Sequence, residues 1–396
     1  MDNSTIRTPV TIKAQGIHDK EDNHRDLLLE QLKNIPKDIK DLDIDDNAPS
    51  DAEWSILGAH FTDVTDLVLE SGFDEMLTDK EIPQHWPLKR LVISSACGET
   101  VQSPFILEGH VNHLVLFFTS SLRFEGPTTD ELCKANKEAI ARGEEEETFV
   151  KVDEGNPEER KISVVSVPSL VQQWINNKYV GSTINCEVPG SPAVNLETLE
   201  IIENDAMDTL VRMALALPHI VFENLKTINI RSTNGCEYPF CPQEMFGQIL
   251  SNLRHLKTLV LTVGEVFDDD ANLFTLHRHF APNISTLRFR GPVSIAKSAQ
   301  WHEWVESFSD PEYLPNLKKL SFVLDMDYSE PAESEQSWVK KHRLETSEES
   351  LREAKAACNQ LYDAARNRGI SVEPFWDHFS SMSKQVHQVD ERWEEL

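Results

Sequence analysis

The sequence predicts an α/β solenoid, in which short parallel strands line a concave sheet and helices cover its convex side. Two observations lead to this fold class. The spelling apolar-x-x-apolar-x-apolar occurs eight times, and its last two apolar residues lie two apart, so both point to the same face of a strand. Most consecutive starts are 23 to 33 residues apart, with one interval of 85 residues. Regular spacing of this kind indicates stacked repeats that share one core.

The eight predicted strands lie where the repeated spelling occurs. The first apolar residue of each triplet lies on the bend before a strand, and the other two enter the core. The period is that of leucine-rich repeats and predicts a horseshoe with parallel strands. The triplets are Val64/Leu67/Leu69, Leu88/Leu91/Ile93, Val111/Leu114/Leu116, Leu196/Leu199/Ile201, Leu225/Ile228/Ile230, Leu256/Leu259/Leu261, Ile284/Leu287/Phe289 and Leu317/Leu320/Phe322.

The amino-terminal part differs in composition from the array. Residues 1–50 are rich in Asp, Asn and Lys, so we expect a mobile polar arm there. Its leucines at 27, 28, 29 and 32 predict one helix over 26–34. The alternative to a mobile arm is that this helix docks as a cap on the first repeat. The array is expected to span 51–380. Its first three strands follow each other closely, so loops or single helical turns should connect them.

The 85-residue interval predicts an acidic insertion at about 122–163. A helix is expected at 129–142, followed by four adjacent glutamates, Glu144 to Glu147. Four such carboxylates cannot be buried together, so this part should be exposed. An apolar piece at 164–174 precedes the next strand.

Helical spacing follows each strand in the second half. These segments are 206–217, 242–253, 269–280 and 298–308. In the fourth, Trp301, Trp304, Val305 and Phe308 form an i, i+3, i+4, i+7 stripe that predicts core packing. After the strand at 320–324, residues 348–368 predict a long helix that ends at Gly369, with a final strand at 370–375. The last segment, 381–396, reads as an acidic tail.

Composition excludes several classes of partner. A net charge of −29 repels nucleic acid and anionic lipid, so we expect neither to bind. No apolar run approaches the roughly 20 residues of a membrane-spanning helix. The amino terminus also lacks a secretory signal pattern, so we expect a cytoplasmic or nuclear protein. We expect it to be a monomer. Six scattered cysteines form no disulfide framework and no metal motif.

No motif for catalysis occurs in the chain. The phosphate loop, the nucleophile elbow and the metal-binding His-Glu-x-x-His helix are all missing from the sequence. His277 and His279 lie two apart on an expected helix and point in different directions, so we expect them at the surface. These observations favour a protein that is not an enzyme, with no cofactor and no metal site.

The concave face carries the candidate binding residues, because alternate strand positions point away from the core. In the first half, Val92, Val115 and Phe117 form an apolar stripe that a partner or the chain's own insertion should cover. In the second half, four basic residues gather within an acidic protein and predict a site for carboxylates or phosphates. The alternative is that they pair with the acidic insertion or tail. These residues are Arg231, Arg288, Arg290 and Lys319.

Two further segments carry a resemblance to a known family. The first is Trp54 with Thr-Asp-Val-Thr-Asp-Leu at 62–67, and the second is Arg-Gly-Ile-Ser-Val-Glu-Pro-Phe at 368–375. With the eight strands, they resemble the leucine-rich-repeat, F-box-like proteins of filamentous fungi over about residues 50–380. Family members with an F-box look like substrate adaptors of ubiquitin ligases. This chain shows no F-box, because Ile-Pro-Lys-Asp-Ile at 35–39 lacks the apolar three-helix pattern.

We therefore expect a non-enzymatic scaffold that binds a protein partner through the concave face. The resemblance implies a substrate-recognition subunit with ubiquitin-ligase components among its partners. Two alternatives stay open. One is a hydrolase or transferase with its site on strand-end loops, which would need clustered titratable residues with shifted pKa values. The other is a solenoid inhibitor that binds a basic enzyme through acidic rims.

Overall fold

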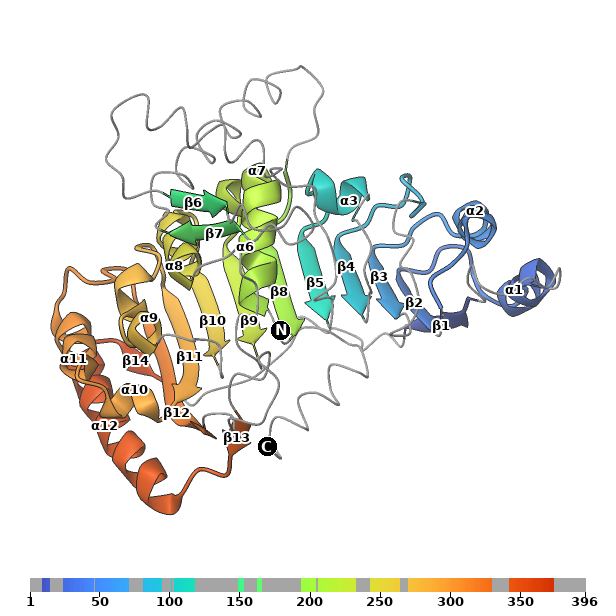
Figure 1. Cartoon of the computed structure of the whole chain (residues 1–396). Helices are drawn as coiled ribbons and strands as arrows, with labels where there is room; N and C mark the ends of the chain where they lie inside the picture. Colours follow the sequence, from blue (N-terminus) through green and yellow to red (C-terminus); the bar gives the residue numbers. More distant parts are fainter. Residues whose placement is uncertain are drawn as a thin grey trace, which may run out of the picture. The chain divides into compact units, whose positions relative to one another are not determined.

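The computed structural model is drawn in Figure 1. It describes residues 9–14, 24–45, 47–70, 81–94, 101, 103–117, 149–152, 162–165, 194–203, 206–232, 243–263, 270–329 and 342–373. These residues belong to two compact units. Unit 1 contains the described residues up to 117 together with 194–200, and unit 2 contains the hairpin segments and the residues from 201 onward. Each unit is considered by itself.

Unit 1 is built from short parallel strands with few helices between them. Its strands are β1 (Val10–Lys13), β2 (Asp41–Asp45), β3 (Asp66–Glu70), β4 (Arg90–Ser94) and β5 (His113–Phe117), followed by the start of β8 (Thr198–Glu203). Its helices are α1 (His24–Leu32), α2 (Asp51–His60) and the single turn α3 (Pro104–Leu107). The single turn between β4 and β5 confirms the short connection expected from the spacing.

Repeat register is regular across unit 1. Leu67 lies opposite Leu91, and Leu91 lies opposite Leu114. All three side chains are fully buried. The predicted strands whose triplets begin at Val64, Leu88 and Val111 are therefore confirmed, and their apolar pairs form one continuous core as the period requires.

The expectation of a mobile polar arm over residues 1–50 is wrong for part of that segment, because it supplies two strands and a helix of unit 1. β1 pairs with β2, and β2 pairs with β3, both in parallel. The spelling is in fact present a ninth time, as Ile39/Leu42/Ile44, where Leu42 and Ile44 are fully buried. Three aspartates alternate with these residues in β2 and give the segment a polar composition, while the period of two still makes it a strand.

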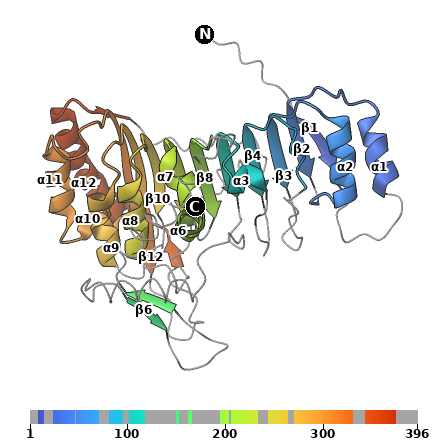
Figure 2. The ribbon, with the colours of Figure 1, turned by 90° about the horizontal axis from the view of Figure 1, so that it is seen from above.

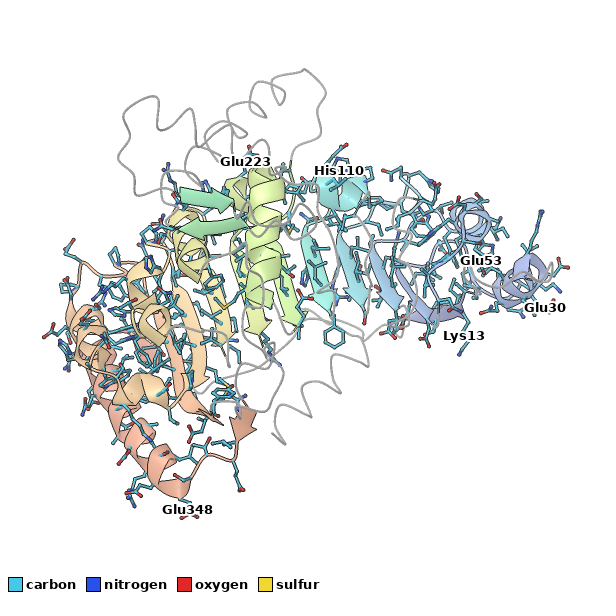
Figure 3. All side chains as sticks on the ribbon, in the orientation of Figure 1. Lys13, Glu30, Glu53, His110, Glu223 and Glu348 are labelled. Atoms are coloured by element: carbon cyan, nitrogen blue, oxygen red, sulfur yellow. The ribbon has the colours of Figure 1, made fainter. Side chains whose placement is uncertain are left out.

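Helix α1 sits beside the first strand, as the cap interpretation predicted. The side-chain amide of Gln31 accepts a hydrogen bond from the Lys13 backbone N–H at 2.9 Å and donates one to the Lys13 carbonyl at 3.0 Å. Lys13 ends β1, and Glu30 lies on α1 (Figure 3). One side chain thus satisfies a donor and an acceptor of the strand at the end of the sheet, which strand edges otherwise expose.

Unit 2 has longer repeats with helices between its strands. After β8 the strands are β9 (Thr227–Ser232), β10 (Thr258–Val263), β11 (Thr286–Pro292), β12 (Lys319–Ser329), β13 (His342–Leu344) and β14 (Ser371–Val372). The helical segments are α6 (Ala206–Ala216), α7 (Pro218–Glu223), α8 (Gln243–Asn252), α9 (Asp270–Phe274), the 3-10 turn η1 (Leu276–His279), α10 (Ser294–Lys297), α11 (Trp301–Ser309) and α12 (Glu348–Asn367). These helices lie on one side of the strands of unit 2 (Figure 2).

The strand order is β1-β2-β3-β4-β5-β8-β9-β10-β11-β12-β13, with β14 beside β12. The registered neighbours from β1 to β5 and from β9 to β12 are parallel, and β13 runs antiparallel to β12. The chain is therefore an α/β protein with an open, mainly parallel, repeat-like sheet. Successive repeats that pair in parallel are what a solenoid sequence predicts, and the register shifts once between β11 and β12, at Gly291/Pro292.

The helices of unit 2 agree with prediction in position and differ at their ends. Helix α8 lies inside the predicted segment 242–253, and α12 matches the predicted segment to within one residue. The segment expected as one helix over 269–280 is divided into α9 and η1. Pro218 follows α6 and begins α7, where the missing N–H of proline has no cost.

Aromatic side chains dominate the core of unit 2. Trp304 is fully buried, and its ring lies 5.6 Å from Phe289 and 5.5 Å from Phe322, centroid to centroid. Trp301 and Phe308 are also buried and Val305 is half-buried, so the predicted core stripe on α11 is confirmed for its three aromatic residues. The surface interpretation of His277 is wrong, because its side chain is only 1% exposed and packs on Trp304 at 4.7 Å. Burial lowers the pKa of His277 to about 4.

The last repeat ends as the sequence predicts. Helix α12 stops at Asn367, and Gly369 follows with a φ of +79°, a left-handed conformation that favours glycine. The guanidinium of Arg368 donates hydrogen bonds to the carbonyls of Phe308, Tyr313 and Leu314 at 3.2, 2.6 and 3.3 Å. Arg368 therefore ties the last helix to the segment that follows α11.

The predicted insertion contains an antiparallel hairpin of β6 (Phe149–Val152) and β7 (Ile162–Val165). This hairpin lies where the sequence predicted an exposed segment and the start of an apolar piece. The predicted helix at 129–142, the four glutamates at 144–147 and the acidic tail at 381–396 lie outside the described residues. Among the helices that the structure describes, none combines the length and apolar character needed to cross a bilayer.

Candidate anion-binding groove

A basic groove lies in unit 2 at the edge where the strands begin. Its volume is about 540 Å³. Its lining consists of four cationic side chains, one histidine and three neutral polar side chains: Lys226, Arg254, His255, Lys257, Asn283, Ser285, Asn316 and Lys318. No carboxylate is among these described residues, although the whole chain carries a net charge of −29.

The repeat places the basic side chains of this groove in a row. Lys226, Lys257, Ser285 and Lys318 each come directly before a strand, namely β9, β10, β11 and β12. Hydrogen bonds run along the row, from the Lys257 N–H to the Lys226 carbonyl at 2.8 Å, from Ser285 to Lys257 at 2.8 Å, and from Lys318 to Ser285 at 2.9 Å. Adjacent parallel strands are about 4.8 Å apart, so the row is a ladder with that spacing.

A second row of polar side chains braces the groove. The Asn283 amide donates to the Arg254 carbonyl at 2.7 Å, and the Asn316 amide donates to Asn283 Oδ1 at 3.3 Å. The Ser285 hydroxyl donates to the Lys257 carbonyl at 3.1 Å. Hydrogen bonds between successive repeats thus fix the backbone of the groove.

Three cations of the groove carry uncompensated charge. Arg254, Lys257 and Lys318 are exposed, and none of them makes an ion pair within the residues that the structure describes. Unpaired cations on a rigid frame attract an anion without first having to lose an internal partner. The arrangement can therefore hold a ligand with several carboxylates or phosphates.

The four basic residues that the sequence singled out lie elsewhere on unit 2. Arg231 lies opposite Thr262 and Thr262 lies opposite Arg290, while Arg288 lies opposite Val260 and Ser321. Their alternating positions put them on the same face of the sheet, as expected. The registers distribute the four over three successive rows, because Lys319 lies opposite Thr286.

Two of these four charges are neutralised by nearby carboxylates. Arg290 donates from Nε and Nη2 to the two carboxylate oxygens of Asp325, both at 2.9 Å. Lys319 Nζ lies 3.0 Å from Glu373 Oε1. The Arg231 side chain is fully buried, and Arg231 and Arg288 interact within the chain as well. Arg290 and Lys319 thus pair within the chain, but through Asp325 in β12 and Glu373 after β14, which lie outside the acidic insertion and tail named in the alternative. A binding role for the four stays a prediction.

The predicted apolar stripe is assembled in unit 1. Val92 lies opposite Val115, and Phe117 lies opposite Ser94 in the next row. Val92, Val115 and Phe117 are all fully buried in the single chain. The chain itself therefore covers these side chains, and their role in binding a partner also stays a prediction.

Two basic side chains on the strands of unit 1, Arg90 and His113, likewise lie near carboxylates. Asp66, Arg90 and His113 lie opposite one another on β3, β4 and β5. His113 Nε2 lies 2.6 Å from Glu200 Oε1. Burial lowers the pKa of Arg90, while Asp66, Glu200 and Asp41 oppose that shift. The described residues contain no group of three or more His, Cys, Asp or Glu side chains arranged to hold a metal.

The groove in unit 2 was not predicted, although the sequence carries a signal for it. The second position of the repeated spelling is Lys in three of the last four units, at Lys226, Lys257 and Lys318. Alternate positions within the strands do not reveal the groove, because it uses the residues that precede the strands. No protein-family model matches the chain, and no curated protein matches it either.

Proposed function

We propose that this protein is a non-enzymatic, repeat-built scaffold that binds an acidic segment of a protein partner in the basic groove of unit 2. The observation that supports this function is the row of cations in a strongly acidic chain, of which Arg254, Lys257 and Lys318 make no ion pair among the described residues. A long acidic segment would bridge several rungs at once, and such multiple contacts add up where single surface ion pairs are weak. The cations would hold carboxylates, and the neutral polar side chains of the groove would add donors.

An acidic protein segment suits the groove better than a nucleic acid does. The net charge of −29 repels a long polyanion whose charge extends beyond the groove. A peptide segment carries its negative charge over a short length, so most of it falls within the positive potential of the groove. Screening then acts over about 8 Å at physiological salt, which makes the interaction local.

The test is the binding of a fluorescein-labelled dodecapeptide of alternating Glu and Ser to the full chain. The double variant Lys257→Glu with Lys318→Glu should weaken binding at least about tenfold, because two attractions become two repulsions and about 1.4 kcal/mol corresponds to tenfold. Wild-type binding should also weaken as salt rises from about 50 to about 300 mM.

A matched control separates the groove from overall charge. Arg352→Glu with Lys355→Glu changes the net charge by the same amount, and both residues are exposed on α12 of the same unit. This control should retain wild-type affinity. Equal loss in both double variants would reject the groove as the site. Tighter binding of a single-stranded oligonucleotide than of the peptide would reject the acidic protein segment as its ligand.

A further inference from the structure

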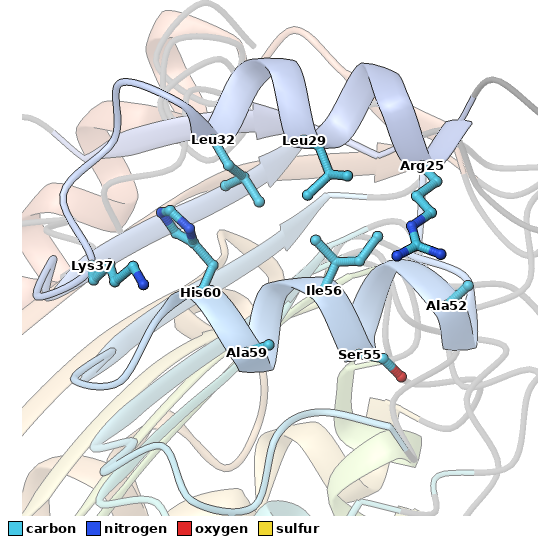
Figure 4. A pocket seen from close by; sticks show the side chains of 9 residues that line it. All are labelled: Arg25, Leu29, Leu32, Lys37, Ala52, Ser55, Ile56, Ala59 and His60. Atoms are coloured by element: carbon cyan, nitrogen blue, oxygen red, sulfur yellow. The ribbon is translucent and has the colours of Figure 1, made fainter.

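A second groove lies in unit 1, between α1 and α2 (Figure 4). Its volume is about 550 Å³. Apolar side chains form most of its lining, and basic side chains stand near its two ends. The lining residues are Arg25, Leu29, Leu32, Lys37, Ala52, Ser55, Ile56, Ala59 and His60.

Helix α1 presents more apolar surface than its own packing uses. Leu28 and Leu32 are buried and hold the helix on unit 1. Leu27 and Leu29, on either side of Leu28 in the sequence, are 49% and 41% exposed. They are two of the four large apolar side chains that are exposed among the described residues. Leu29 lines the groove and Leu27 does not, so the exposed side chain of Leu29 is the surplus apolar surface that α1 offers there.

Helix α2 supplies the opposite wall of the groove. Ile56 is half-buried and points toward Leu29 across the groove (Figure 4). Ala52 and Ala59 lie seven residues apart, about two turns on the same face, and both are exposed. Small side chains at these positions leave room beside Ile56. The wall is fixed in place, because α2 begins with a capping box of Ser50 and Glu53 and buries Trp54 and Leu57.

The two ends of the groove are positively charged. Arg25 lies at one end, and Lys37 lies at the other beside His60 (Figure 4). Arg25 and Lys37 are exposed, and neither makes an ion pair within the part of the chain that the structure describes. His60 Nε2 lies 3.0 Å from the Ile35 carbonyl, which anchors the loop that carries Lys37. The cations therefore have fixed places at opposite ends of an apolar bed.

We propose that this groove binds an amphipathic helix of a protein partner, with apolar residues at i, i+3, i+4 and i+7 and carboxylates near both ends. Helices of 9 and 10 residues are about 14 and 15 Å long, so a partner helix of about three turns spans the groove. An apolar stripe would cover Leu29 and Ile56, and acidic ends would meet Arg25 and Lys37. This mode is that of a helix in a groove between two helices.

The exposure of the lining favours a helix over a small molecule. Small-ligand sites bury most of the surface of their ligand, whereas Leu29, Ala52 and Ala59 are all exposed along an open groove. A helix gains affinity from a long, shallow apolar contact of this kind. This proposal does not rest on the function proposed for unit 2, since it concerns other residues and a partner surface of different chemistry.

Three labelled peptides test the proposal on the full chain by fluorescence anisotropy. The first is a helical peptide of about 16 residues with leucines at i, i+3, i+4 and i+7 and two glutamates at each end. The second carries lysines at the ends, and the third carries serines in place of the leucines. The first should bind at least about tenfold more tightly than either of the others. Equal binding of the first and second peptides would overturn the charge argument.

Variants then locate the binding. Ile56→Glu should weaken binding of the first peptide at least about tenfold, because it puts a charge among the apolar side chains of the groove. The matched control is Leu351→Glu on α12 of unit 2, where the leucine is 38% exposed; it should bind like wild type. Arg25→Glu with Lys37→Glu should reverse the preference between the acidic and basic peptides. Unchanged binding by Ile56→Glu with an unchanged circular dichroism spectrum would reject the groove.

Two further measurements distinguish the groove of unit 1 from the basic groove of unit 2 and from a dimer interface. Lys257→Glu with Lys318→Glu should leave the affinity for the first peptide unchanged. The binding proposed for each groove can then be rejected without affecting the other proposal. Sedimentation of the full chain should show the same oligomeric state for the wild type and for Ile56→Glu. A wild-type dimer that Ile56→Glu abolishes would assign the groove to a second copy of the chain and overturn the proposal of a different partner.

Discussion

Trp301 and Trp304 provide a sensitive test of the packing in unit 2, because the same substitution should have different costs at two positions one helical turn apart. Trp304 Nε1 donates a hydrogen bond to the Phe274 carbonyl at 2.7 Å. Trp301 Nε1 is buried and has no hydrogen-bond partner in the described part of the chain. Replacing each indole by a phenyl ring removes a donor that is used in one case and unused in the other.

The free energies follow from these contacts. Trp304→Phe leaves a cavity worth on the order of 1–2 kcal/mol at a fully buried site. It also removes the donor to the Phe274 carbonyl, at about 1 kcal/mol. Trp301→Phe leaves a smaller cavity at a site with 9% exposure, and the loss of an unsatisfied buried N–H offsets about 1 kcal/mol of that cost. The two variants should therefore differ by about 2 kcal/mol.

Equilibrium urea unfolding followed by circular dichroism measures this difference. Both substitutions lie in unit 2, so the same transition reports both, and the midpoints are compared at equal slopes. Trp304→Phe should lower the midpoint clearly, and Trp301→Phe should leave it near that of wild type. Equal destabilisation by the two variants would refute the reasoning that the hydrogen bond of Trp304 makes Trp304→Phe the more costly substitution.

Two other outcomes follow from unit 2. Gly369→Ala should destabilise by about 1 kcal/mol in the same assay, since no atom obstructs an added Cβ but its φ is left-handed, and Gly369→Asn should cost less. An alanine variant as stable as wild type would contradict this. His277 has a folded pKa of about 4, lowered by burial, against an ordinary value of 6.5, so its contribution to stability is full above pH 6.5 and is lost as the pH falls toward 4. His277→Phe should reduce the loss of stability between about pH 7 and 4.5 by up to about 2.5 kcal/mol. An unchanged pH profile would show that other groups govern the pH dependence of stability.

The strands could be predicted because the apolar spelling depends only on local geometry. A period of two in the strand and one apolar residue on the bend are enough to place Leu259, Leu287 and Leu320 in one row, where the register indeed has them. The same spelling at Ile39, Leu42 and Ile44 is masked by the three aspartates of that segment. The composition of that segment predicts a polar arm, whereas its period of two predicts a strand. The period decides which of its residues are buried.

The fate of individual charges could not be predicted from the sequence. Arg290 and Asp325 are 35 residues apart, and their contact depends on neighbouring strands and on the lengthened β12. Lys319 meets Glu373 only because β14 returns to pair with β12. The burial of His277 similarly depends on the break between α9 and η1, which helical spacing over 269–280 does not reveal.

Because the two sets of cations in unit 2 differ in charge compensation, we expect them to differ as binding sites. A partner that engages Arg290 must compete with a bidentate contact to Asp325, so the gain from the new ion pair is offset by the loss of the old one. Lys257 and Lys318 carry no such cost within the described residues, and their backbone is already fixed by the ladder of hydrogen bonds. We therefore expect similar numbers of positive charges on the two surfaces to give unequal affinities for an acidic segment. The difference lies in the free chain before binding, because Lys257 and Lys318 begin without a counter-charge among the described residues, whereas Arg290 and Lys319 each have one.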